Sequence, residues 1–244
     1  TWTWSGWVKR NKVGHYSGLF GGADSSNTQG IYLTNDDEIY VPIGGQNHIW
    51  SPKIRDLAWY HIVLAVDTTQ STDTNRIKTY INGVELTSSD VKTAGWPSED
   101  VETSVSNTSL HTIGRNAGNS GSYGEYYLSQ VYFIDGQALD ASYFGFNDPL
   151  TNTWKPKKYT GTFTGTNTFY LPFDGNSPIG KDQSGNGNDF TPVNFGGSVA
   201  LDNPQVSGAK PILNTTQGGT QAGVGVFGSK QNVGYAVTVY NDGG

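Results

Sequence analysis

The 244-residue sequence contains neither cysteine nor methionine. Without cysteine the chain forms no disulfide framework and no thiolate metal site. The missing methionine means that no start codon is represented, and residues 1–10 already have the alternation of a strand. We therefore expect the chain to begin inside a longer polypeptide. No signal peptide is visible, although a segment before Thr1 could carry one.

Long apolar runs and basic stripes are also missing. No stretch approaches the ~20 apolar residues of a membrane-spanning helix, and no window keeps a helical period. The chain has 15 Lys and Arg against 21 Asp and Glu, a net charge of −6. A mildly acidic chain of this kind is a poor partner for nucleic acid and for anionic membranes. We expect neither as a ligand.

What the sequence does contain favours short strands joined by many turns: 33 glycines, with many Thr, Asn, Ser and Tyr. Residues 59–86 form the clearest unit, a predicted hairpin. Its first run, 59–66, is apolar on both parities, which indicates a strand covered on both sides. The polar stretch 67–76 is its predicted loop. Asn82-Gly83 predicts a tight turn or bulge, because both residues tolerate a positive φ.

Other segments extend this all-β pattern. Trp2 and Trp4 share one parity and are expected in the core of a sandwich, although exposed tryptophans could also stack on sugars. Residues 46–55 are a predicted connection, and 87–109 a long polar loop. Residues 138–144 are the best candidate for a short helical turn. Further strands are predicted at 17–20, 30–33, 38–43, 110–115, 125–135, 168–173 and 190–195.

Four stretches, taken together, resemble the laminin-G-like branch of the concanavalin A-like jelly rolls. They are TWTWSGWVKR; WYHIVLAVD followed by KTYINGVEL; HTIGR; and YLSQVYFIDGQALDASYFG. The match covers roughly residues 1–145 and depends on their order and spacing. It implies an antiparallel β-sandwich of two sheets, in which Trp59 and His61 are core and hydrogen-bonding residues. Tyr60, which separates them, is a small departure from the family pattern.

A second resemblance lies later in the chain. FYLPFDGNSPIGKDQSGNGNDFTPVNF is similar to a stretch that commonly opens laminin-G-like domains. Either a strand is contributed late to a permuted sandwich, or a second module begins here. We favour the first, because few strong strands follow. This predicts a sandwich over residues 1–200, completed by late strands in 168–195. Residues 201–244 are then an irregular C-terminal extension, or the start of another module with a strand at 233–240.

The whole arrangement, including the LDNP stretch at 201–204, resembles virion structural proteins of marine tailed phages. That resemblance implies a location on the surface of an extracellular virion. It also implies other virion subunits, or further copies of this chain, as partners. It identifies no ligand.

Catalytic patterns are absent from the sequence. Laminarinase-type relatives of the fold alternate two Glu and one Asp on one strand, because hydrolysis needs paired carboxylates. Here residues 35–38 have the wrong spacing, and no nucleophile elbow, HExxH or phosphate-binding loop occurs. We predict no catalytic residues and a protein that is not an enzyme. A glycoside hydrolase of atypical pattern remains an alternative by analogy of fold.

A glycan site needs an aromatic face for the C–H surface of a sugar, with amides or carboxylates nearby for its hydroxyl groups. Three sets in predicted loops have that composition. The alternative for each is an aromatic ring packed on its own loop or on a neighbouring subunit. The sets are Trp50 with Asn47 and His48, Trp96 with Glu99 and Asp100, and Tyr123 with Asn119.

Calcium is the expected metal. Hard cations bind several oxygen ligands from a compact loop, and Asp182, Asn186, Asn188 and Asp189 supply them within eight residues. The alternative is that the same side chains form Asx turns and hydrogen-bond the loop to itself. Both interpretations stay open at the level of sequence.

The function predicted from these observations is a non-enzymatic, virion-associated binding module of tail-fibre or surface-adhesin type. It would recognise a glycan or another component of the host surface. The first alternative is a structural protein for capsid decoration or fibre assembly. An extension buried on a partner would favour assembly, and a shallow aromatic-lined pocket would favour binding.

Overall fold

The computed structural model describes residues 1–24, 27–118, 122–174 and 178–193. The chain divides into two compact units, of which the first contains Thr1–Leu171 with Asp182–Asn188. The second contains Pro172–Lys181 with Asp189–Gly244. The first unit holds every strand described below.

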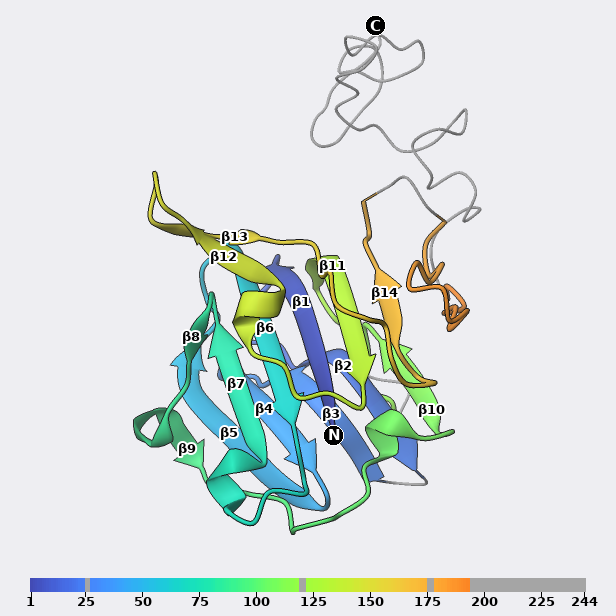
Figure 1. Ribbon diagram of the computed structural model, residues 1–244. Coiled ribbons are helices and arrows are strands. Elements are labelled where there is room, and N and C mark those ends of the chain that lie inside the picture. Colours follow the sequence, from blue (N-terminus) through green and yellow to red (C-terminus); the bar gives the residue numbers. More distant parts are fainter. Residues whose placement is uncertain (25–26, 119–121, 175–177, 194–244) are drawn as a thin grey trace, which may run out of the picture. The chain divides into compact units, whose positions relative to one another are not determined.

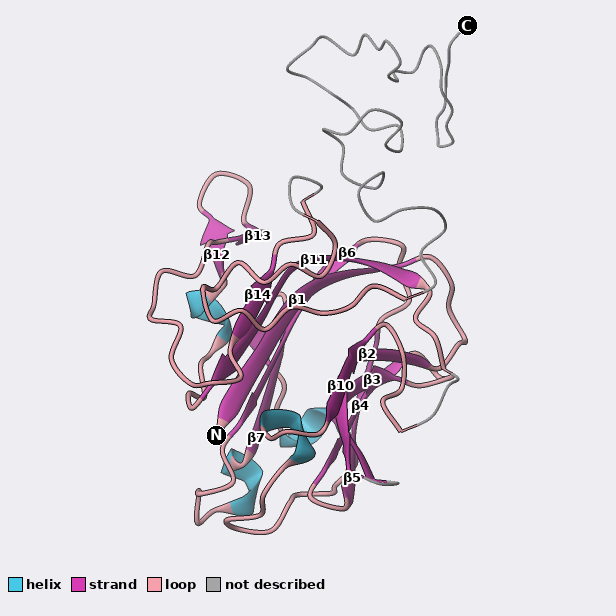
Figure 2. Ribbon diagram, turned by 90° about the vertical axis from the view of Figure 1, so that its right-hand side faces the viewer, coloured by secondary structure: helices cyan, strands magenta, loops and turns pink. Residues whose placement is uncertain are grey.

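Two antiparallel six-stranded sheets form the first unit, which confirms the predicted all-β sandwich (Figures 1 and 2). The first sheet has the order β14-β11-β1-β6-β7-β8. Its strands are β1 (Trp2–Arg10), β6 (Trp59–Val66), β7 (Ile77–Ile81), β8 (Val84–Glu85), β11 (Tyr126–Asp135) and β14 (Phe169–Leu171). β14 is the late strand expected from the sequence, and it pairs with the outer edge of β11.

The second sheet has the order β10-β2-β3-β4-β5-β9. Its strands are β2 (Ser17–Asp24), β3 (Asn27–Leu33), β4 (Glu38–Ile43), β5 (Gln46–Lys53), β9 (Val91–Thr93) and β10 (Leu110–Ile113). A separate ribbon pairs β12 (Gly145–Asp148) with β13 (Thr153–Pro156). The short 3₁₀ turns are η1 (Asp73–Asn75), η2 (Ser88–Asp90), η3 (Ser104–Ser106) and η4 (Ala141–Tyr143), the last within the predicted helical turn. None of these described helices has the length and apolarity that crossing a bilayer requires.

Aromatic rings fill the space between the sheets. Trp2 and Trp4 are fully buried, as their parity predicted. Phe133 of β11 lies 5.6 Å from the Trp2 ring and 5.3 Å from that of Phe20 in β2. Phe169 of β14 lies 5.6 Å from Phe133. β14 therefore contributes to the same core as the earlier strands.

The outer face of the first sheet is covered as well. Residues 137–163 cross it and bury Val63, Tyr132 and Ile134 against Leu139, Phe144 and Tyr159. This explains why both parities of residues 59–66 are apolar. The hairpin itself is confirmed: Asn82 and Gly83 have φ values of 50° and 85°, which close the turn between β7 and β8.

Some expectations from the sequence need correction, and others concern residues outside the described ones. Residues 46–53 form strand β5 rather than a connection, because β4 and β9 pair with its two edges. Trp59 is not a core residue: it starts β6 and is 42% exposed. Residues 190–193 form no strand, while residues 194 and 195, the strand at 233–240 and the extension 201–244 lie outside the described residues.

Candidate functional site

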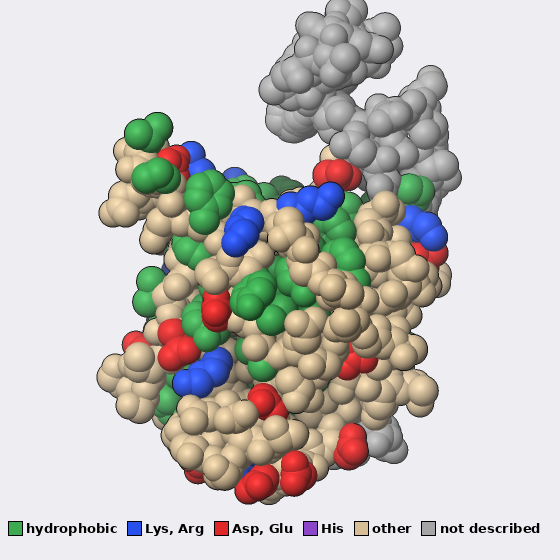
Figure 3. All heavy atoms as spheres, viewed as in Figure 1, with side chains coloured by type: hydrophobic (Ala, Val, Ile, Leu, Met, Phe, Trp, Pro, Cys, Tyr) green, Lys and Arg blue, Asp and Glu red, His purple; other side chains and the backbone are tan. Residues whose placement is uncertain are grey.

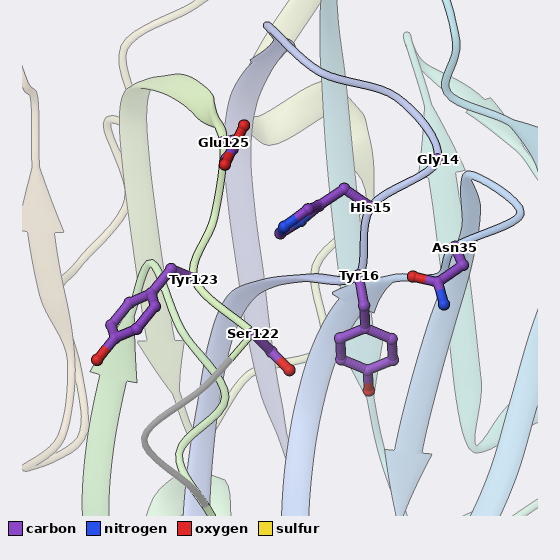
Figure 4. Close-up of a pocket in the computed structure, with 7 residues that line it drawn as sticks. All are labelled: Gly14, His15, Tyr16, Asn35, Ser122, Tyr123 and Glu125. Carbon is purple, nitrogen blue, oxygen red and sulfur yellow. The ribbon is translucent and has the colours of Figure 1, made fainter.

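Three connections meet at one end of the sandwich and surround a hollow of about 510 Å³ (Figure 4). The first joins β1 to β2, the second joins β3 to β4, and the third leads into β11. The register explains why they meet, since the end of β1 pairs with the start of β11 and the start of β2 with the end of β3. The lining residues are Gly14, His15, Tyr16, Asn35, Ser122, Tyr123 and Glu125.

The lining combines aromatic surface with several kinds of hydrogen-bonding group. Tyr123 is 49% exposed. His15 points from the β1–β2 connection toward the loop that carries Ser122 and Glu125 (Figure 4). Asn35 adds an exposed amide from the β3–β4 turn. A volume of this size, lined by tyrosine rings and a few polar groups, is within the range of sites that take small ligands.

A buried carboxylate holds two of the three connections in place. Asp37 accepts a hydrogen bond of 2.6 Å from the Gly14 N–H, and its oxygens lie 3.3 Å from Arg10 Nη2 and 2.9 Å from Arg55 Nε. Burial alone would raise the pKa of Asp37, but these three donors outweigh it and hold the pKa below its ordinary value. Arg10 also donates to the carbonyl of His15, 3.3 Å away. The β1–β2 connection is therefore tied to the start of β4.

Tyr16 connects the hollow to the second sheet. Its ring lies 5.9 Å from that of Tyr32 and 6.3 Å from that of Tyr40. Burial raises the pKa of the Tyr16 hydroxyl, with a smaller contribution from Tyr40. The phenol therefore stays neutral near pH 7 and can only act as a hydrogen-bonding group.

The structure brings two of the predicted glycan sets into one aromatic cluster. His48 lies between Trp50 and Trp96, with ring centroids 4.5 Å and 4.1 Å away. His48 is fully buried and Trp50 is 2% exposed, because β5 directs both side chains away from solvent. Trp96 is half-buried on top of them. Here the packing alternative describes the rings better than an open sugar-stacking face.

The polar partners in those two sets have other contacts. Asn47 is exposed, and its side-chain oxygen accepts a 2.6 Å hydrogen bond from the Tyr40 hydroxyl. Glu99 pairs with Arg76 at 3.5 Å. Asp100 has a φ of 58° in an exposed turn. Neither Glu99 nor Asp100 lines the hollow, whereas Tyr123 does. Asn119, the predicted partner of Tyr123, lies outside the described residues.

The most deeply buried acidic pair near the hollow is already neutralised. Glu38 is 3% exposed, and its two oxygens lie 3.1 Å from Lys53 Nζ and 2.8 Å from Lys92 Nζ. Asp37, the preceding residue, binds two arginines as described above. Both carboxylates therefore act in ion pairs that hold strands together.

The loop predicted to bind calcium is hydrogen-bonded to itself. Asp182 accepts four bonds of 2.8–2.9 Å, from the backbone N–H groups of Tyr170, Ser184 and Asn188 and from the Ser184 hydroxyl. Asn186 and Asn188 donate their side-chain amides to carbonyl oxygens, including that of Thr168. These bonds explain the composition of the loop without an ion.

Asp189, the fourth predicted ligand, belongs to the second unit, where it pairs with Lys181 at 2.9 Å. Within the described residues, no group of three or more histidine, aspartate or glutamate side chains is arranged to hold a metal ion. Calcium at residues 182–189 stays a prediction.

Sequence reasoning missed His15, Asn35, Ser122 and Glu125, which line the hollow with Tyr123. Each lies in a short polar connection that carries no motif of its own. Only the strand order brings these connections together. The one sequence signal for Asn35 was the run of turn residues at 35–37, which leads from the end of β3 into β4.

Comparison with known proteins agrees with this architecture. The family model of the concanavalin A-like lectin/glucanases superfamily matches residues 1–142, more than half of the chain. A proposed carbohydrate-binding protein from Bacteroides ovatus is similar in structure, with a TM-score of 0.50 and 17% identity over 77% of this chain and 50% of its own. No curated protein matches the sequence significantly.

Two further solved structures are more distant. A heptameric SAP-like pentraxin from Limulus polyphemus has a TM-score of 0.39 at 17% identity, covering 57% of this chain and 64% of its own. Domain 4 of AbnA, a GH43 arabinanase from Geobacillus stearothermophilus in complex with arabinotriose, has a TM-score of 0.38 at 21% identity, covering 58% and 63%. The chain thus spans half of the Bacteroides protein and less than two thirds of these two.

Proposed function

The chain belongs to the concanavalin A-like lectin/glucanases superfamily, and from this premise we propose that it is a non-enzymatic glycan-binding module. The hollow beside Tyr123 is its binding site. A sugar ring stacks on the exposed tyrosine, while Asn35, His15 and Glu125 exchange hydrogen bonds with its hydroxyl groups. The observation that carries the proposal is this combination of an exposed aromatic ring and three kinds of polar group around one hollow of about 510 Å³.

The superfamily name covers both lectins and glucanases, so the proposal of a non-enzymatic module depends on the acidic side chains of this chain. Glycoside hydrolysis needs two carboxyl groups about 5–9 Å apart across a substrate groove, one of them able to donate a proton. Asp37 and Glu38 are held in ion pairs, and among the described residues Glu125 is the one carboxylate that lines the hollow. Release of reducing sugar from any bound glycan would instead support the hydrolase alternative.

A glycan array tests the binding site. Tyr123→Ala and Asn35→Ala should each weaken binding of the best wild-type glycan roughly tenfold, as expected for loss of one stacking or hydrogen-bonding contact. Tyr143→Ala is the matched control, because Tyr143 is 45% exposed but lies on η4, outside the hollow. Unchanged binding by both hollow variants, or an equal loss with Tyr143→Ala, would contradict this site.

We extend the proposal to the surroundings of the module. It sits on the surface of a tailed-phage virion, in a tail fibre or surface adhesin, and binds a glycan of the host surface. This extension depends on the sequence resemblance alone. Antibodies against the chain should label intact phage particles in electron micrographs, and particles that carry the gene but no label would contradict it.

One observation favours the alternative role in capsid decoration or fibre assembly. The β12–β13 ribbon ends in Leu150, which is 93% exposed, and Phe146 on the same ribbon is 44% exposed. Exposed apolar residues at the tip of a ribbon fit contact with another subunit or another copy of the chain. Leu150→Ser should then lower the mass of any oligomer measured by light scattering. An oligomer of unchanged mass in Leu150→Ser would favour the binding role over the assembly role.

Calcium at residues 182–189 remains part of the proposal. If the loop binds calcium, EDTA should lower the melting temperature and added calcium should restore it by mass action. A melting curve that is indifferent to both reagents would leave the hydrogen-bonded loop as the explanation.

A further inference from the structure

Three side chains form a row across the first sheet at the end of β1. Lys9 lies opposite Trp59 of β6 on one side and opposite Tyr127 of β11 on the other. Directly opposed residues in antiparallel strands project from the same face of a sheet. Because neighbouring strands are about 4.8 Å apart, the two aromatic residues stand roughly 10 Å from each other, with the lysine between them.

The row projects from the outer face, away from the second sheet. Thr3 and Ser5 have the same parity as Lys9, and they bond to Gln137 and His61 on that outer side. Trp59 is 42% exposed and Tyr127 is 57% exposed. Lys9 is half-buried, and within the described residues its ammonium group has no ion-pair or hydrogen-bond partner. The row therefore presents two exposed rings to solvent, with a half-buried lysine between them.

The covering segment, residues 137–163 on the outer face of the first sheet, stops beside this row. Trp154 donates to His61 Nδ1 at 2.9 Å, and Tyr159 packs on Tyr132 with ring centroids 6.1 Å apart. The chain between them therefore crosses β1 next to Trp7, one step along the same face from Lys9. Residues 155–158 carry three lysines, of which Lys158 is exposed and also has no partner within the described residues.

Charged side chains of both signs lie on this face. Figure 1 shows β1 rising from the N-terminus at the lower end of the sheet, so the row lies at the upper end. Figure 3, in the same view, shows Asp and Glu side chains along the lower rim, and further up the face it shows them beside Lys and Arg side chains. The cation of the row, Lys9, has no partner among the described residues, and such a cation favours a ligand that is itself anionic.

We propose that Trp59, Lys9 and Tyr127 form a second glycan-binding surface, which takes an acidic polysaccharide built from uronic acid residues. The two rings stack on sugar faces that lie about two residues apart along the chain. The Lys9 ammonium binds a carboxylate group of the intervening sugars, and the exposed Lys158 of the covering segment adds a second cation on the same face of the sheet. The class of ligand rests on the proposed glycan-binding function, whereas the surface is separate from the hollow beside Tyr123.

Calorimetry with an oligogalacturonate of about eight residues tests this surface, with the fully methyl-esterified oligomer as its neutral counterpart. The wild-type protein should bind the acidic oligomer more tightly, and salt should weaken that binding. Trp59→Ala and Tyr127→Ala should each weaken it roughly tenfold. Lys9→Gln should weaken it about fivefold and reduce its dependence on salt.

Matched controls come from the same chain. Phe146→Ala removes an aromatic ring of similar exposure, 44%, from the ribbon, and Lys78→Gln removes a lysine of β7 that pairs with Glu85. Neither should change the affinity. Equal affinity for the acidic and esterified oligomers, or no effect of the three row variants, would overturn the proposal. The proposal would also be overturned if Trp59→Ala lost self-association while the wild-type protein did not bind the oligomer.

The two glycan proposals fail separately. Tyr123→Ala should leave binding of oligogalacturonate unchanged, because Tyr123 lies in the hollow and not in the row. If the row variants have no effect while Tyr123→Ala abolishes array binding, only the second surface is wrong. If Tyr123→Ala has no effect on the array while the row variants lose the acidic oligomer, only the hollow is wrong.

Discussion

Arg10 and Asp37 form an ion pair in which both side chains are buried, with Arg10 Nη2 lying 3.3 Å from Asp37 Oδ1. Arg10 ends β1 of the first sheet, and Asp37 precedes β4 of the second. The pair therefore links the two layers directly beneath the proposed glycan site. The Gly14 N–H and the Arg55 guanidinium complete the coordination of the carboxylate.

Arg10→Leu should lower the free energy of unfolding by about 3–5 kcal/mol, because it leaves a buried carboxylate with a single, largely exposed cation. Urea denaturation measures this loss. Lys78→Gln is the control: its ion pair with Glu85 is 3.7 Å long and more than one-third exposed, so its loss should cost under ~1 kcal/mol. Similar costs for the two variants would show that the Arg10–Asp37 pair does not hold the layers together.

Acid should destabilise the protein through two buried histidines. Burial lowers the pKa of His48 to about 4 and that of His61 to about 3, against ~6.5 in an unfolded chain. Trp154 can only donate, so His61 Nδ1 is an acceptor and Nε2 carries the proton toward Ser5. Protonation of Nδ1 would remove the bond from Trp154.

The direction in which stability changes with pH follows from which state, folded or unfolded, binds more protons. Above about pH 6.5 both histidines are neutral in both states and contribute no pH dependence. Below it the unfolded chain takes up protons that the folded protein does not, so stability falls toward pH 4 for His48 and pH 3 for His61. Between its unfolded and its folded pKa, each histidine should lower the free energy of unfolding by about 1.4 kcal/mol per pH unit. Melting temperatures measured from about pH 7.5 to about pH 4.5 should therefore decline, and more gently in His48→Gln. A flat profile would contradict this assignment.

Gly83→Ala should destabilise the protein through two effects. Its φ of 85° is unfavourable for alanine by about 1–2 kcal/mol, and a Cβ there would meet the ring of Trp154. Gly45→Ala separates the two effects, since Gly45 has a φ of 78° with no atom within 4 Å of an added Cβ. The midpoint of urea unfolding should fall further for Gly83→Ala than for Gly45→Ala. Equal shifts would show that Trp154 moves aside at no cost.

Asp182→Ala should lower the free energy of unfolding by roughly 2–4 kcal/mol, because it leaves four donors without their acceptor, three of them backbone N–H groups. The N–H of Tyr170 is among them, so β14 should loosen from β11. Hydrogen exchange at residues 169–171 reports that loosening directly. Asp36→Ala is the control, since the Asp36 side chain is exposed and pairs with Lys92 at 3.4 Å. Protection of β14 that is unchanged in Asp182→Ala would contradict this role.

The fold was largely accessible from the sequence, because its signals are local. Strand alternation, the Asn82-Gly83 turn and the buried parity of Trp2 and Trp4 follow from backbone preferences and hydrophobicity. The order of four family-like stretches predicted the two-sheet sandwich. The helical turn at η4 and strand β14 were likewise visible in short segments.

The site was accessible only in part. Composition identified Tyr123, but it also selected Trp50 and His48, which β5 buries. Whether an aromatic residue is exposed depends on which element covers it, and no local pattern records that. Trp59 shows the converse: its apolar neighbours predicted burial, yet the covering segment ends before it reaches the start of β6.

The sequence by itself determined that this chain is an all-β sandwich without cysteine chemistry, since hydrophobic period and turn residues act over a few positions. Only the tertiary structure decided where a ligand can bind. The pairing of β1 with β11, and of β2 with β3, places residues more than 100 positions apart around one hollow. The pairing of β1 with both β6 and β11 aligns Trp59, Lys9 and Tyr127 in one row. Such neighbours are set by strand register, a long-range property that no single stretch of the chain contains.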